Sequence, residues 1–120
     1  MTDRQRAIES IEKALEVSAA LRHRLVANER AGRSMVKALE RGDPVSMVVG
    51  GSREPASELR RSTTELLADY ETVRHHMRTA LVLPYLAEGK SVGDFSRELG
   101  VSRQLASRLV KQAHETSPGE

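Results

Sequence analysis

A glycine at position 100 separates two short helical patterns by so few residues that the chain must turn sharply there. Ser91 is suited to cap the first pattern, because Asp94 follows three residues later, and Phe95 and Leu99 share one face at a four-residue spacing. Gly100 can adopt the left-handed backbone conformation that ends a helix. We therefore predict two short helices packed around a tight corner.

The second pattern, over residues 102–114, has an apolar side and a polar, basic side. Its apolar side consists of Ala106, Leu109, Val110 and Ala113, with Val101 in the corner. Its polar side consists of Arg103, Gln104, Ser107, Arg108 and Lys111, after a candidate N-cap at Ser102. Arginine can bond the edge of guanine and glutamine that of adenine, while serine and lysine reach phosphate oxygens. We predict that this face binds DNA, together with Lys90, Ser91 and Ser102; the alternative is a helical corner with a solvated basic face.

Residues 77–114 resemble the helix-turn-helix superfamily, and in particular the region-4-type domains of sigma factors and related small bacterial regulators. The resemblance is carried by Phe95, Ser96, Leu99, Gly100, Val101, Ser102, Arg103, Gln104, Ala106 and Leu109, after the lead-in at 86–91. Ser96 stands where many members have alanine, and Ala106 where a β-branched residue is usual, which predicts looser packing. The resemblance implies a DNA-binding domain over 83–115, in a cytoplasmic, nucleoid-associated protein that binds double-stranded DNA.

The composition predicts an all-α protein of elongated form. Charged residues make up 30% of the chain and aromatic residues only 2%, so large side chains for a thick core are scarce. The sequence contains no cysteine, which excludes disulfides and thiol catalysis, and it has no apolar run long enough to cross a membrane. We expect a soluble, cytoplasmic protein without a signal peptide and without a membrane partner.

Positive charge is concentrated near the predicted corner. Residues 74–114 contain seven Lys or Arg and three Asp or Glu, whereas residues 1–73 contain twelve of each sign. Release of counterions from DNA phosphates should therefore be driven by the C-terminal part of the chain.

Helical spacing of apolar residues predicts a long antiparallel hairpin over residues 1–82. Its first helix extends from about 3 to 40, a breaker loop follows at about 42–56, and a second helix starts at Ala56. Pro84 should kink or end this helix between Leu81 and Pro84, and a separate short helix at 84–88 should lead into the corner.

A coiled-coil seam is expected along the second long helix. The seam consists of Leu59, Thr63, Leu66, Tyr70, Val73, Met77 and Ala80, which alternate by four and three positions. The residues expected to dimerise are Leu59, Leu66, Tyr70, Val73 and Met77. Because two helices alone would leave part of this surface uncovered, we predict a homodimer; the alternative is a monomeric hairpin covered by the corner itself.

No residue pattern indicates catalysis, a metal site or a cofactor. The four histidines lack a set of partners with the spacing of metal ligands, and no Ser/His/Asp set or acid pair has a catalytic context. Residues 116–120 are expected to form a disordered tail. The favoured function is a dimeric, sequence-specific transcription regulator. The alternatives are a nucleoid-type architectural DNA binder and an adaptor that contacts RNA polymerase or another regulator.

Overall fold

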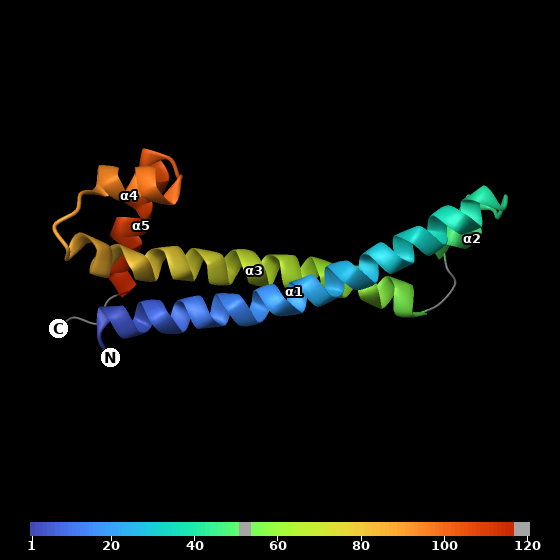
Figure 1. Cartoon of the computed structure of the whole chain (residues 1–120), viewed down its shortest axis with the longest axis horizontal. Helices are drawn as coiled ribbons and strands as arrows, with labels where there is room; N and C mark the ends of the chain where they lie inside the picture. The colour runs from blue at the N-terminus through green and yellow to red at the C-terminus, as the bar shows by residue number, and fades with distance from the viewer. Residues whose placement is uncertain (51–53, 117–120) are drawn as a thin grey trace. The chain divides into compact units, whose positions relative to one another are not determined.

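The computed structural model describes residues 1–50 and 54–116, and the side chains of residues 1–50 and 62–116. It contains five helices, α1 (Asp3–Glu40), α2 (Val45–Gly50), α3 (Glu54–Leu86), α4 (Val92–Leu99) and α5 (Arg103–Thr116) (Figure 1). Because these described residues include no strand, the predicted all-α fold class is confirmed.

The segment predicted as a breaker loop contains a helix. Gly42 ends α1 with φ of 91°, and its N–H donates to the Leu39 carbonyl at 3.0 Å. Pro44 then starts α2, since its carbonyl accepts the N–H groups of Met47 and Val48 at 3.0 and 3.1 Å. The predicted end of the first long helix is therefore confirmed, but the expectation of an irregular loop is wrong for residues 45–50. Residues 51–53 of that loop lie outside the described part.

Pro84 lies inside α3, so the expected separate helix at 84–88 does not form. Proline removes one backbone donor, but the next turn keeps its hydrogen bonds, with the Ala87 N–H donating to the Leu83 carbonyl at 3.0 Å. Val82, two residues before the proline, is fully buried in an apolar cluster, and Leu86, two residues after it, packs against that cluster. This packing on both sides holds α3 in one helix up to Leu86.

The chain divides into two compact units. The first unit combines Met1–Leu15 with Thr72–Glu120, and the second unit is Glu16–Glu71. The core of the first unit joins three helices through Val82 of α3, Phe95 of α4, and Leu109 and Ala113 of α5, all of them buried. Val82, the last residue of the predicted hairpin, thus packs in the same core as α4 and α5.

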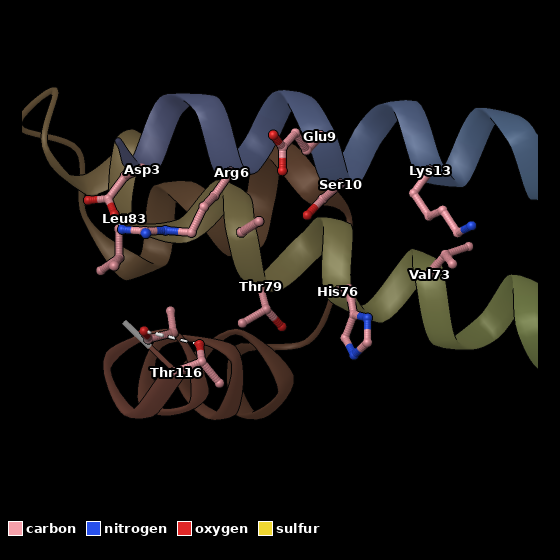
Figure 2. Close-up of a pocket in the computed structure, with 12 residues that line it drawn as sticks. Asp3, Arg6, Glu9, Ser10, Lys13, Val73, His76, Thr79, Leu83 and Thr116 are labelled. Carbon is pink, nitrogen blue, oxygen red and sulfur yellow. Dashed lines mark hydrogen bonds and ion pairs between the residues drawn. The ribbon is translucent and has the colours of Figure 1, made fainter. Parts of the chain in front are cut away.

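The start of α1 and the end of α3 run antiparallel in the first unit. Asp3 lies beside Leu83 and Lys13 beside Val73 (Figure 2). Ala7 is buried in this region, and its small side chain allows two helices to approach closely.

The second unit is packed more thinly than the first. None of its described residues, 16–50 and 62–71, is buried, and Asn28 joins α1 to α3 through a hydrogen bond from Nδ2 to Thr63 Oγ1 of 3.0 Å. Large apolar residues such as Leu25, Val36 and Met47 are exposed. Among the described helices, none has an apolar stretch sufficient for a membrane crossing.

Candidate nucleic-acid interface

The start of α4 is fixed by a complete capping box. The Asp94 N–H donates to Ser91 Oγ at 3.0 Å, and the Ser91 N–H donates to Asp94 Oδ2 at 2.9 Å. The hydrogen bond from the Ser91 backbone lowers the pKa of Asp94, with help from the Ser91 hydroxyl and from Arg97 at 2.6 Å. The cap predicted from the sequence is confirmed, and it orients the first turn of α4.

The corner after α4 has the left-handed glycine that the sequence predicts. Gly100 has φ of 71° and ψ of 33°, and its N–H donates to the Ser96 carbonyl at 3.0 Å. The Ser96 hydroxyl donates to the Val101 carbonyl at 2.7 Å, which ties the last turn of α4 to the corner. Ser102 then caps α5, because its Oγ accepts the Leu105 N–H at 3.1 Å.

Small residues bring α4 and α5 together at the corner. Ala106 is fully buried, and Ser96 is buried while its hydroxyl is hydrogen-bonded. These are the two positions at which the chain departs from the helix-turn-helix pattern. Here the serine adds a hydrogen bond to the corner that an alanine could not make.

A contact between α3 and α4 sets the position of the corner within the first unit. The Tyr85 hydroxyl donates to Glu98 Oε2 at 2.7 Å, and the Tyr85 and Phe95 rings lie 5.3 Å apart between centroids. Partial burial and the hydrogen bond to Glu98 raise the pKa of Tyr85 to about 12. No sequence pattern predicts this contact, because the paired residues are 13 positions apart and belong to different helices.

The structure brings four of the predicted DNA-binding residues together on α5. Arg103, Gln104, Ser107 and Arg108 line one shallow hollow, and all four are exposed. Within the described part of the chain, none of these four side chains makes a hydrogen bond or an ion pair. Their polar groups are therefore available to a ligand.

The other predicted contact residues do not line this hollow. Lys90 and Ser91 are exposed just before α4, and Ser102 and Lys111 are exposed at the start and in the middle of α5. The Ser91 and Ser102 hydroxyls already accept backbone N–H groups as helix caps. A hydroxyl in this role can still donate its proton to a phosphate oxygen.

Arg97 is a cation near this surface that sequence reasoning did not single out. A Cβ built on Gly93 would lie 3.4 Å from Arg97 Nη1 and 3.6 Å from Arg103 Nη2, so two guanidinium groups lie over the first turn of α4. The position of Arg97 three residues after Asp94 was the available signal, since this spacing places both side chains on one face of a helix.

Most of the predicted dimerisation residues are buried or half-buried within a single copy of the chain. Val73 is buried in the first unit, where Met77 is half-buried, and Leu66 and Tyr70 are half-buried in the second unit. The side chain of Leu59 lies outside the described residues. The half-buried and buried seam residues therefore have contacts inside one copy of the chain.

A hollow of about 370 Å³ lies between α1, α3 and the end of α5 in the first unit (Figure 2). It carries charges of both signs, with Arg6 paired to Asp3 at 2.8 Å and with Lys13 and Glu9 farther along α1. Because these charges compensate one another, the hollow favours no single class of charged ligand. Among the described residues, no group of three His, Asp or Glu is placed to hold a metal ion.

Comparisons with protein-family models, with curated proteins and with solved structures gave no match.

Proposed function

We propose that this chain is a dimeric, sequence-specific DNA-binding transcription regulator whose helix α5 enters the major groove. The observation that supports this most is a set of four exposed side chains on one face of α5 that have no hydrogen-bond partner among the described residues, Arg103, Gln104, Ser107 and Arg108. They extend from a helix whose opposite side is anchored by Leu109 in the core. A rigid helix with free polar groups on its outer face is what readout of base edges requires.

The residue types on this face divide into two roles. Arg103 and Arg108 can each present two donors to guanine, and Gln104 can pair with adenine through its amide. Lys111 and Lys90 are suited to phosphates, which position the protein without reading the sequence. A specific site therefore depends on the arginines and the glutamine, and general affinity depends more on the lysines.

The net charge of residues 74–114 favours only a moderate affinity of a single copy of the chain for DNA. Residues 74–114 have four more cations than anions, so one copy neutralises only a few phosphates and its binding should weaken as salt is added. Two copies would carry two α5 helices, which could bind successive major grooves about 34 Å apart. Dimerisation would thus supply the affinity that one corner lacks.

The experiment that tests this function measures binding to DNA selected from a random pool. Arg103→Ala and Gln104→Ala should each weaken binding to the selected duplex by about 1 to 3 kcal/mol, and weaken binding to a scrambled duplex much less. Lys111→Ala should weaken binding to both duplexes equally. Arg30→Ala is the matched control, because Arg30 is also exposed but lies on α1 in the second unit.

Equal losses on both duplexes for Arg103→Ala and Gln104→Ala would refute base reading and favour a nucleoid-type binder. A parent protein that selects no sequence and binds no duplex would refute DNA binding altogether and favour the adaptor.

A further inference from the structure

An apolar groove of about 390 Å³ lies in the first unit, away from the polar face of α5. Ile8 and Ile11 of α1 form one wall, and Phe95 and Leu99 of α4 form the other. The end of α3, which includes Pro84, provides the floor and lies between α1 and α4 (Figure 1). Since the floor and both walls belong to one compact unit, the groove is a preformed feature of the fold.

An apolar ridge on α1 stands next to this groove. Ile8, Ile11 and Leu15 are 50%, 36% and 64% exposed, so together they form a contiguous exposed apolar surface. Their spacing of three and four residues places them in one stripe, the arrangement by which helices pair. A two-fold axis parallel to α1 would set the ridge of each copy into the groove of the other, so both apolar surfaces would be covered at once.

The charges at the rim are also complementary under this symmetry. Arg4 lies on the α1 side of the groove, and Glu88 and Glu98 lie on the side of α4. Within the described residues Arg4 makes no ion pair, whereas Glu98 already accepts the hydroxyl of Tyr85. Among the described residues Glu88 is therefore the rim carboxylate without an ion-pair partner, and the two-fold axis would bring it toward Arg4 of a second copy.

We propose that this groove binds a second copy of the same chain, with the ridge of each copy in the groove of the other and Arg4 of each copy paired to Glu88 of the other. This inference names the surface that pairs the two copies. It rests on the proposed function, in which a dimer presents two α5 helices to DNA. It places the interface on α1, α4 and the end of α3, and Val73 of the predicted seam is buried within one copy.

A charge-exchange experiment tests the pairing between copies. Analytical ultracentrifugation should show that the parent is a dimer, and that Arg4→Glu alone and Glu88→Arg alone dissociate at least about 10-fold more readily, because like charges then face each other. An equimolar mixture of the two variants should form dimers again, because each contact then joins opposite charges. A contact within one chain could not be restored by mixing.

Two controls separate the interface from general effects of charge and folding. Arg22→Glu makes the same change on an exposed residue of α1 in the second unit and should leave the dimer intact. Ile11→Glu should abolish the dimer, whereas Leu67→Glu, at a residue that is 48% exposed in the second unit, should not. Circular dichroism of each variant should retain the helical signal of the parent.

A monomeric parent, a dimer unchanged by Arg4→Glu and Glu88→Arg, or a mixture that stays monomeric would overturn the proposal. DNA binding is measured separately on the same samples. A dimer that responds to the variants as expected but binds no DNA supports the interface and refutes DNA binding. A monomer that selects a DNA sequence refutes the interface and supports DNA binding.

Discussion

Replacing Gly100 by alanine should destabilise the corner by an amount that follows from backbone conformation alone. A Cβ at this position would meet no heavy atom within 4 Å, so steric contact with the rest of the chain adds nothing. The cost is that of holding an alanine at φ of 71°, about 1 to 2 kcal/mol. Alanine also restricts the unfolded chain, which offsets about 0.4 to 1 kcal/mol. We expect a net loss of about 1 kcal/mol and a Tm lower by about 3 to 6 °C.

The assay is urea and thermal unfolding followed by circular dichroism, with Gly93→Ala as the matched control. Gly93 belongs to the same helix, but its φ is not left-handed and its added Cβ would make only ordinary contacts, the nearest at 3.4 Å to Arg97. The same chemical change should therefore leave stability unchanged or raise it by up to about 1 kcal/mol. Gly100→Asn should cost less than Gly100→Ala, because asparagine tolerates this conformation better. A Gly100→Ala protein as stable as the parent would refute the left-handed corner.

Three further predictions concern the groups that hold the corner. Ser96→Ala should lower the free energy of unfolding by about 0.5 to 1 kcal/mol in urea, since a lost hydrogen bond outweighs the better helix propensity of alanine. In a Tyr70→Phe background, ultraviolet absorbance should show Tyr85 half-ionised near pH 12, and Glu98→Gln should lower this value; a phenol titrating near 10 would contradict the contact. The pKa of Asp94 is lowered in the folded state, so its contribution to stability is present above pH 3.8 and is lost as the pH falls through the folded value. Asp94→Asn should therefore reduce the fall in stability below pH 4, and an unchanged acid profile would count against the capping box.

Features that depend on nearby residues could be predicted from the sequence. Ser91, Gly100 and Ser102 act within three to five residues of their own positions, so their types and spacing were enough to predict a cap, a corner and a second cap. The exposed face of α5 also followed from local periodicity, because Leu109 marks the side that must be buried. The binding of DNA by that face stays a prediction.

Features that depend on distant residues could not be predicted in this way. The local preference of Pro84 favours the end of a helix, but packing on both sides of it keeps α3 intact. Likewise the seam pattern at Val73 indicates that another apolar surface must cover this side chain, but it does not indicate whether that surface belongs to the same chain or to a second copy. In the structure Val73 is buried within one chain. The breaker residues at 42–56 do not indicate α2, because a proline such as Pro44 can start a helix as well as end one.

Phe95 links the two proposals physically. Phe95 is a lining residue of the apolar groove and also belongs to the buried cluster that holds Leu109 of α5. A second copy seated in the groove would therefore cover a side chain whose other contacts position the helix proposed to bind DNA. The Phe95 ring also lies against the tilted ring of Tyr85, whose hydroxyl donates to Glu98, so pairing of two copies would restrain α4 against α3 at the same time. Dimerisation would then do more than add a second α5. It would also make the packing of α3 and α4 that positions each α5 more rigid.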